Sequence, residues 1–580
     1  MDYILKKYCP RIEFDSYEDF YQNFKINVPE VFNFGYDVVD EWARVEPDKP
    51  ALMWCDDNEN ERLFSFTDIS RLSNKTAHAF RKLGIGKGDI VMCILRRRWE
   101  YWVVASALCK LGAIVIPATL QLTAHDISYR ANKCGVKMMV CVDDDYVCAQ
   151  VEGALPESPS IAQRIVVPSH SLGASASNDH TPSVKDEDGA REGWLSFHEL
   201  IAGEPETWER PSADDPQAVT SKDIMLIYFT SGTTGHPKPV MHNYAHPLGH
   251  ILTAKYWQQV RENKLHMSVT DSGWAKFGWG KIYGQWISGA TIFCYDMKKF
   301  VPSKLLQHMQ DYKLTTFCAP PTMYRFMLQE DVASYDLSSI QNFATAGEPL
   351  NAEVTIKWEQ LTGKKIREGF GQTEGPVLLA TYPWIEPKPG SMGKPSPLLG
   401  IKLLDDDGNE VDDGEEGAIC VTGLKEAYPP GLFVGYYGMP EVTEETVGGA
   451  YYNLHDMAWR DGAGYVSFVG RNDDVIKCSG YRISPFEVES ALVKHDAVIE
   501  CAVTAAPDPI RGLVVKATVV LAGGWTPSDE LTKELQTWVK KETAPYKYPR
   551  IIEYTDELPK TVGGKIKRKL IRSLDGVTDE

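Results

Sequence analysis

A loop rich in glycine and hydroxyl side chains, Thr230–Lys238, is the segment of the sequence best suited to hold a phosphate. It follows an apolar, β-prone run, Ile224–Phe229, that predicts a buried strand. Glycines let backbone N–H groups turn toward an anion, while hydroxyls and a lysine add further donors. No Gly-Lys-Ser/Thr opens a helix, and Pro237 and Pro239 disfavour an immediate one. The loop therefore favours a flap over a polyphosphate, although alone it is equally typical of a polar surface turn.

Four further segments carry side chains suited to a nucleotide. They are Ala346–Leu350, Arg367–Glu374, Gly470–Arg482 with Asp456 ahead of it, and Pro559–Lys565. Taken singly, these residues have ordinary structural interpretations: a carboxylate as a cap or ion-pair partner, an arginine as a surface ion-pair partner, a phenylalanine as core, and Gly-Gly-Lys as a flexible tail. Their joint occurrence in this order favours a site for ATP.

Each segment would supply one part of that site. Phe370, with Gly347 beside it, is suited to sandwich a purine, and Asp456 is suited to accept hydrogen bonds from both ribose hydroxyls. Glu374 is suited to hold Mg²⁺, a hard cation that prefers carboxylate and phosphate oxygens. An α-phosphate, whose charge grows during attack, could be surrounded by Thr373, Arg482 and Lys565.

Together these motifs resemble the acyl-adenylate-forming superfamily, which includes acyl-CoA synthetases, peptide-synthetase adenylation domains and luciferases. The similarity runs from about residue 35 to residue 572, and the motifs that carry it are Thr230–Lys238, Gly371–Glu374, Gly470-Arg471 and Gly564-Lys565. Within the superfamily the chain most resembles medium-chain acyl-CoA synthetases. That closer similarity rests on Asp271–Trp274, Ser479–Ile483, Pro507–Gly512 and Thr543–Pro549.

The resemblance implies roles at the matching positions. ATP would be bound by Thr230, Ser231, Gly232, Thr233, Thr234, Gly235, Lys238, Gly347, Glu348, Pro349, Glu368, Gly369, Phe370, Gly371, Gln372, Thr373, Asp456, Arg471, Arg482 and Lys565. Catalysis would involve Lys565, Thr230, Glu374 and Arg482, with Glu374 as the Mg²⁺ ligand. Coenzyme A would meet Gln121, Ser479, Gly480, Tyr481, Arg511, Lys540 and Tyr548. The acyl pocket would be lined by Trp274, Lys276, Cys318 and Gly347.

Four positions modify this expectation. His455 stands before Asp456 where the family usually has glycine, which leaves the backbone geometry there open. His236 replaces a residue that is often small or apolar, with little expected effect. Trp274 would shorten the acyl pocket, whereas Lys276 is interpreted slightly more readily as a surface lysine than as a pocket residue.

The resemblance implies a two-step reaction. ATP would activate a short- to medium-chain carboxylic acid, branched acids included, to acyl-AMP and pyrophosphate, and coenzyme A would then take the acyl group after the C-terminal domain rotates about Asp473. One alternative is an adenylation enzyme that loads an aryl or amino acid on a carrier-protein pantetheine. Others are an inactive nucleotide-binding paralogue and, on fold alone, a luciferase-like oxygenase.

The predicted fold class is α/β. Residues 1–472 would form a large domain of doubly wound α/β subdomains with a small β-barrel subdomain, and residues 473–580 a mobile α+β lid domain. In the large domain the patterns predict a helix over 72–83, strands over 89–95 and 315–319, and a helix over 323–330. Asn351 is predicted to cap a helix that ends at Gly363. Residues 153–215, rich in Ser, Pro and acidic residues, predict a long surface excursion.

In the smaller domain the patterns predict a helix over 485–494, strands over 498–505 and 514–521, and a helix that Ser528 caps. One earlier segment, Tyr101–Leu120, is long and apolar enough to suggest a membrane span. Gly112 and the run Ile114–Pro117 instead favour a buried helix followed by a short strand.

Composition sets the remaining limits. A formal net charge of −19 disfavours nucleic acid and anionic membranes as partners. The partners that the resemblance implies are the carboxylic acid, ATP and coenzyme A. A homodimer is a further hypothesis. Twelve cysteines without metal-like spacing indicate free thiols in a reducing compartment. Because the N-terminus resembles neither a secretory signal nor a transit peptide, a cytoplasmic location is expected.

Overall fold

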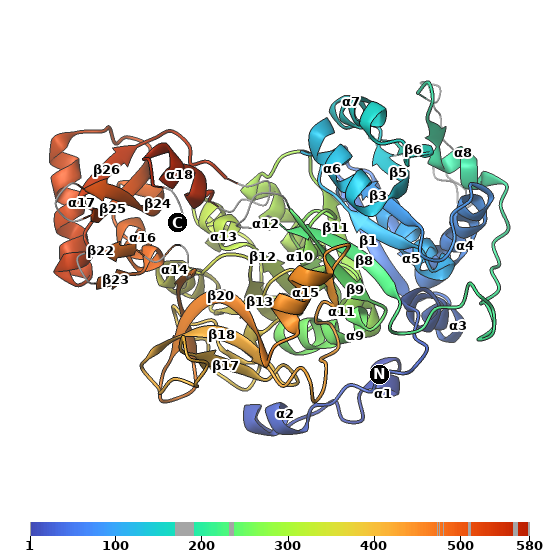
Figure 1. The fold of residues 1–580 in the computed structure, drawn as a ribbon, viewed down its shortest axis with the longest axis horizontal. Coiled ribbons are helices and arrows are strands. Elements are labelled where there is room, and N and C mark those ends of the chain that lie inside the picture. Colours follow the sequence, from blue (N-terminus) through green and yellow to red (C-terminus); the bar gives the residue numbers. More distant parts are fainter. Residues whose placement is uncertain are drawn as a thin grey trace.

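Two large, mostly parallel sheets make up the greater part of the molecule (Figure 1). The computed structural model describes residues 2–168, 191–230, 237–471, 474, 476–478, 481–508, 512–560 and 566–577, with the backbone alone at 477, 481, 482 and 512. The predicted α/β fold class is confirmed.

The first large sheet has eight strands. In spatial order they are β19 (Gly435–Tyr436), β9 (Lys238–Asn243), β8 (Ile224–Thr230), β4 (Ile114–Pro117), β3 (Ile90–Ile94), β5 (Val136–Val142), β6 (Gln163–Val167) and β7 (Leu195–Ser196). Helices cover both faces, so successive residues of β3 enter different cores: Val91 and Cys93 on one side, Ile90 and Met92 on the other. The covering helices are α4 (Phe66–Lys82), α5 (Glu100–Leu111), α8 (Phe197–Ala202), α6 (Ala124–Cys134) and α7 (Asp145–Ala154).

The second large sheet has nine strands, and its central strands are parallel. In order they are β16 (Lys394–Pro395), β15 (Leu379–Ala380), β14 (Ile366–Phe370), β13 (Asn342–Thr345), β12 (Thr316–Ala319), β10 (Leu265–Ser268), β11 (Thr291–Asp296), β1 (Pro50–Asp56) and β2 (Glu61–Ser65). The helices of this part and of the links to the first sheet are α3 (Glu41–Val45), α9 (His246–Ile251), α10 (Ala275–Gly280), α11 (Tyr283–Ile287), α12 (Pro302–Asp311), α13 (Pro321–Met327) and α14 (Ala352–Thr362).

The predicted small β-barrel subdomain is a four-stranded antiparallel sheet. Its order is β17 (Ile401–Leu404), β18 (Glu416–Thr422), β20 (Tyr451–Arg460) and β21 (Val466–Arg471), with α15 (Pro440–Val447) before β20. The elements after it gather on one side of the molecule (left in Figure 1). They are β22 (Ile476–Cys478), β23 (Tyr481–Ile483), α16 (Pro485–Val493), β24 (Val498–Asp508), β25 (Gly512–Leu521), α17 (Asp529–Glu542), β26 (Ile551–Tyr554) and α18 (Arg568–Leu574).

Most elements expected from the sequence are present. The segment that suggested a membrane span is α5, all of it buried, followed by Gly112 in a left-handed conformation and by β4. No helix among the described residues is both long and apolar enough to cross a bilayer. Asn351 caps α14 by accepting a hydrogen bond from the Glu353 N–H, and Gly363 ends that helix with φ of 69°.

Two expectations need correction. The predicted helix over 323–330 is α13, which starts at Pro321 and ends at Met327. The predicted surface excursion over 153–215 is wrong at β6, which joins the first sheet, and at α8, which packs Phe197 and Ile201 into the core. Residues 203–215 are irregular and mostly exposed, as predicted. The prediction used the overall composition of the segment, in which the short apolar runs of β6 and α8 do not stand out. Residues 169–190 lie outside the described part of the chain.

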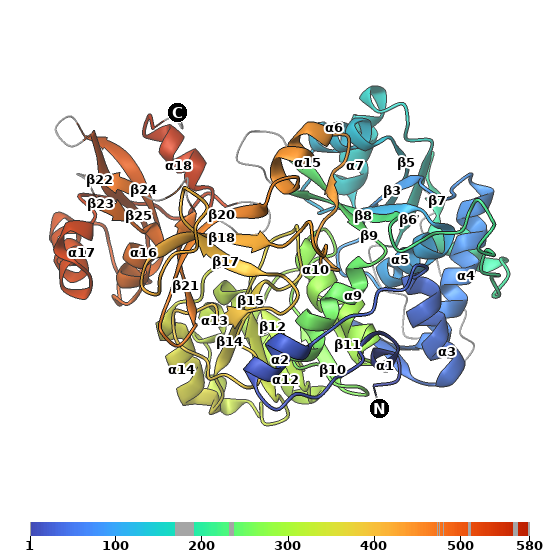
Figure 2. The same cartoon turned by 60° about the horizontal axis from the view of Figure 1, so that its bottom comes forward.

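The first part of the chain, residues 2–34, crosses the lower side of the molecule as a strap that includes α1 (Leu5–Tyr8) and α2 (Tyr17–Asn23) (Figures 1 and 2). The strap is held by late residues. Tyr256 donates its hydroxyl to the Ile12 carbonyl (3.0 Å), and Trp384 donates Nε1–H to the Phe14 carbonyl (3.0 Å). Buried Phe20 lies between these two rings, 4.5 Å and 4.9 Å from their centres.

All twelve cysteines lie among the described residues. Each is buried and none forms a disulfide, as the sequence indicates.

Candidate active site

The strands on the two sides of the glycine-rich segment pair with each other, and a strand rather than a helix follows it. β8 ends at Thr230, β9 begins at Lys238, and these two residues face each other across an antiparallel ladder. The prediction that no helix follows the loop at once is confirmed. Lys238 Nζ lies 5.2 Å from the centre of the Tyr436 ring. The residues between the strands, which include Ser231, Gly232, Thr233, Thr234 and Gly235, lie outside the described part of the chain.

The end of β14 passes closely over two buried indole rings. A Cβ atom at Gly369 would collide with the Trp257 ring, and one at Gly371 would collide with the Trp279 ring. Only glycine therefore fits at either position without displacing a tryptophan. Phe370 between them is half-buried, with its ring centre 6.4 Å from that of Phe468.

Gln372, Asp456 and Arg471 form one connected group. Asp456 and Arg471 are directly paired across β20 and β21, with Nη1 and Oδ1 3.9 Å apart. Gln372 donates Nε2–H to Asp456 Oδ2 (2.6 Å) and accepts at Oε1 from the Tyr452 hydroxyl (2.9 Å). Asp456 is only 6% exposed. The group thus orients the Asp456 carboxylate beside the Arg471 guanidinium.

His455 adopts a backbone conformation that explains why the family usually has glycine at this position. Its φ is 61°, in the left-handed region that side chains rarely adopt. Its N–H donates to Asn453 Oδ1 (2.8 Å), which supports the strained backbone. The departure at this position therefore leaves Asp456 opposite Arg471.

Thr373 and Glu374 are held from two sides. The Thr373 carbonyl lies 2.9 Å from His242 Nε2 on β9, and the Glu374 carbonyl accepts the Phe433 N–H (2.6 Å). Glu374 Oε1 accepts the Tyr436 hydroxyl at 3.5 Å. Sequence reasoning missed His242, Tyr436 and Tyr452, because no motif contains them. The only signal for the first was the regular spacing of His242, His246 and His250.

Gly347 and Lys276 lie close together at the end of β13. Gly347 has φ of 109°, and Lys276 Nζ donates to the neighbouring Ala346 carbonyl (2.7 Å). Lys276 is half-buried, and its place in the acyl pocket stays a prediction. Glu348 is turned toward α13, where Oε1 accepts the Thr322 N–H (2.7 Å) and caps that helix. Pro349 is half-buried in the same loop.

The other two acyl-pocket candidates lie on different elements. Trp274 precedes α10 and is half-buried. Cys318 on β12 is completely buried, and burial raises the pKa of its thiol. Ser268 and Gln258 both hydrogen-bond to that thiol.

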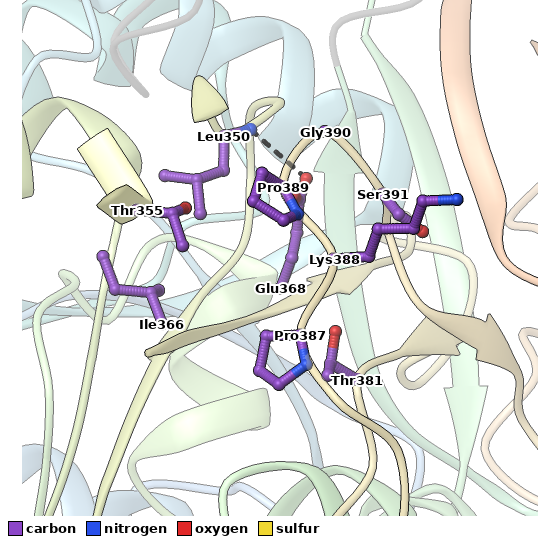
Figure 3. A pocket seen from close by; sticks show the side chains of 10 residues that line it. All are labelled: Leu350, Thr355, Ile366, Glu368, Thr381, Pro387, Lys388, Pro389, Gly390 and Ser391. Atoms are coloured by element: carbon purple, nitrogen blue, oxygen red, sulfur yellow. Dashed lines mark hydrogen bonds between the residues drawn. The ribbon is translucent and has the colours of Figure 1, made fainter. Parts of the chain in front are cut away.

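Glu368 lines a cavity of about 10 Å³ together with residues 387–391 (Figure 3). The Leu350 N–H donates to its Oε1 (3.2 Å), and the side chain is buried. Burial raises the pKa of this carboxyl to about 8. The cavity, which Thr381 and Ser391 also line, has room for about one water molecule.

Glu368→Gln should remove a pH dependence of stability. Between about pH 4.5 and 8 the folded protein holds a proton that the unfolded chain has lost. The free energy of unfolding should therefore fall as pH rises through this window, by up to about 1.4 kcal/mol per pH unit. The free energy of unfolding of the glutamine variant should lack this fall. Relative to that of the wild type it should therefore rise toward pH 8, as measured by urea denaturation. Parallel pH profiles would contradict the assignment.

Of the coenzyme A candidates, two are in contact. Lys540 Nζ lies 3.9 Å from the centre of the Tyr548 ring. Gln121 is exposed in the turn after β4. Tyr481 and Arg482 are placed by their backbone on β23, opposite β22. The remaining candidates, Ser479, Gly480 and Arg511, lie outside the described residues, as do Lys565 and the predicted hinge Asp473.

Metal binding has one candidate group here, the Glu374 carboxylate. Across the described ranges, no three His, Cys, Asp or Glu side chains gather as a metal-ligand set.

Comparison with known proteins supports the resemblance. A family model described as "AMP-binding enzyme" matches residues 39–437, and one described as "AMP-binding enzyme C-terminal domain" matches residues 487–565. The mitochondrial acyl-coenzyme A synthetase ACSM3 of Mus musculus is 38% identical over 97% of this chain and 94% of its own length. The mitochondrial acyl-coenzyme A synthetase ACSM4 of Homo sapiens is 40% identical over 94% and 91%.

Solved structures agree. The anthranilate CoA ligase AuaEII in complex with anthranoyl-AMP superposes with a TM-score of 0.82 at 28% identity, over 94% of this chain and 98% of that one. The acyl-CoA synthetase of Brucella canis gives 0.71 at 27% identity, over 97% and 99%.

The expected cytoplasmic location is wrong. The similar curated enzymes from mouse, rat, orangutan and human are all named mitochondrial. The prediction relied partly on reduced thiols, which indicate a reducing compartment but do not identify which one.

The larger family model spans well over half of the chain, and relatives near 40% identity span almost all of it. The chain belongs to the AMP-binding enzyme family.

Proposed function

We propose that the chain is an AMP-forming acyl-CoA synthetase for short- to medium-chain carboxylic acids, branched acids included. The observation that carries the proposal is the convergence of three groups, at the end of β8, just after β14, and across β20 and β21. These are the Thr230/Lys238 hairpin, the clamped Thr373–Glu374 segment, and the Gln372–Asp456–Arg471 group. The relatives named above are acyl-coenzyme A synthetases, which supports the same activity.

In the first step a carboxylate oxygen of the acid attacks the α-phosphorus of ATP, forming acyl-AMP as the bond to pyrophosphate breaks. Asp456 accepts from the ribose hydroxyls with Arg471 beside it, and Thr373 donates to the α-phosphate. Lys565 and Arg482 supply positive charge where both reactants are anionic. Mg²⁺, held by Glu374 and the phosphates, would neutralise further charge, since proteins commonly bind it through one or two carboxylates and substrate phosphates.

In the second step the thiolate of coenzyme A attacks the acyl carbon and AMP leaves. Lys565 and the Ser479–Tyr481 segment cannot occupy the same face of the acyl-AMP. The C-terminal lid, residues 473–580, therefore rotates about Asp473 and exchanges one for the other. Lys540 and Tyr548, already stacked, then meet coenzyme A together with Arg511 and Gln121. A homodimer remains a prediction, which sedimentation velocity would test.

A substrate panel tests the function directly. Purified protein, ATP, Mg²⁺ and coenzyme A should form AMP and acyl-CoA with acids from butyrate to octanoate, within a set that runs from acetate to palmitate and includes branched and aromatic acids. Trp274 and the half-buried Lys276 should disfavour long chains. A preference for palmitate contradicts the pocket size. Acid-dependent pyrophosphate release without thioester indicates a carrier-protein acceptor, and no release indicates an inactive paralogue.

A further inference from the structure

Three histidines behind the Thr373–Glu374 segment form a buried cluster that has no part in the two reaction steps described above. His242 lies on β9, and His246 and His250 lie one turn apart on α9. Their exposed fractions are 0%, 2% and 0%. The ring centres of His242 and His246 are 3.9 Å apart, and those of His246 and His250 are 4.5 Å apart. Such a cluster within a core needs a reason beyond packing.

Hydrogen-bond partners determine which ring nitrogens carry protons. His242 Nε2 lies 2.9 Å from the Thr373 carbonyl and His246 Nδ1 lies 3.3 Å from the Gly431 carbonyl. A carbonyl only accepts, so both nitrogens are N–H donors. Burial lowers the pKa of His246, so the ring is neutral, and with the proton on Nδ1 its Nε2 accepts from His250 Nε2 (3.1 Å).

The chain of bonds continues on the far side of the third ring. With its proton on Nε2, His250 accepts at Nδ1 from the Thr253 hydroxyl (3.2 Å). The arrangement thus needs only one proton on each ring. Burial agrees with this assignment, because it lowers the pKa of His242 to about 4 and of His250 to about 3.

The two carbonyls that the histidines hold lie on either side of the Glu374 backbone. One belongs to Thr373. The other, Gly431, belongs to the loop whose Phe433 N–H donates to the Glu374 carbonyl (2.6 Å). That loop is pressed against α9, since a Cβ at Gly249 would collide with Pro430 and Gly431. His242 thus holds the Thr373 carbonyl, and His246 holds the loop that bonds to the Glu374 carbonyl. We call these two contacts the histidine clamp.

We propose that His242 and His246 are positioning residues for adenylate formation: their ring N–H groups fix Thr373 and the Gly431–Phe433 loop, and thereby aim Thr373 at the α-phosphate and Glu374 at the metal. The inference rests on the proposed function through the roles of Thr373 and Glu374. It assigns the histidines no contact with the substrate.

Amide isosteres test the proposal at each position. The glutamine side-chain nitrogen lies near the place of histidine Nε2, and that of asparagine near Nδ1. His242→Gln should therefore retain most of the acid-dependent ATP–pyrophosphate exchange, whereas His242→Asn should lose about 10²-fold, the cost of misplacing a catalytic group by about 1 Å. At His246 the order should reverse, because there Nδ1 is the donor: asparagine should be the better variant.

The reversal separates positioning from stability. A loss of core volume or polarity would rank asparagine and glutamine the same way at both positions, as thermal denaturation of all four variants would show. The same ranking at both positions, or four variants equal to the wild type, overturns the proposal. If a variant at one position does not fold, the ranking of asparagine and glutamine at the other position still tests the proposal there. Wild-type exchange is measured first, and its absence would overturn the proposed function instead.

Discussion

Lys565→Ala should slow acyl-AMP formation by about 10²–10³ or more, as expected when a donor to developing transition-state charge is lost. In the proposed mechanism Lys565 bridges the carboxylate and the α-phosphate only during the first step. Thioester formation from preformed acyl-AMP and coenzyme A should therefore be largely spared. Pyrophosphate exchange reports the first half-reaction, and acyl-CoA formation from synthetic acyl-AMP reports the second.

Gly480→Leu should show the opposite pattern, because a side chain there would block pantetheine in the second conformation. Lys560→Ala is the matched control. It removes the same charge five residues before Lys565, from a lysine that is paired with Glu500 (2.7 Å), and should change neither half-reaction. If folded Lys565 and Gly480 variants lose both half-reactions equally, the two-conformation account is wrong.

Asp456→Ala should raise KM for ATP by about 10²–10⁴, because two hydrogen bonds to a charged acceptor are each worth about 1.5–3 kcal/mol. The substitution also leaves Gln372 Nε2 and Arg471 without the carboxylate that they contact now. Asp456→Asn should lose less, since it keeps one oxygen in place. Steady-state kinetics at saturating acid and coenzyme A would measure both effects.

Deoxynucleotides separate ribose recognition from general damage. The wild type should discriminate against 2′-deoxy-ATP and 3′-deoxy-ATP, and Asp456→Ala should not, because the missing hydroxyl has no acceptor left to lose. Undiminished discrimination in the variant would refute the ribose assignment.

The elements that carry the site were predictable because their signals are local. A buried apolar run followed by glycines and hydroxyls predicted β8 and the loop after it, and the prolines correctly argued against a helix. The cap at Asn351 and the glycine at 363 correctly predicted the first and last residues of α14. β6 and α8 were missed because their apolar runs are short and stand within polar sequence.

Side-chain direction was not predictable from motif spacing. Glu348 and Glu368 both stand within the matched segments, yet one caps α13 and the other faces a cavity behind β14. Lys276 looked like a surface residue until the fold brought it to the Ala346 carbonyl, 70 residues away. The histidine clamp depends on contacts of comparable range, such as that of His242 with Thr373 over 131 residues, which no local pattern encodes.

The strap at the start of the chain bears on how the protein is made. Phe14 and Phe20 are synthesised early, but their partner Trp384 lies 370 residues beyond Phe14. At about 5–20 residues per second, that interval is roughly 20–75 s. Both phenylalanines must wait that long before their binding surface is complete, so a segment synthesised early is among the last to dock. During translation the strap is therefore a natural binding site for chaperones.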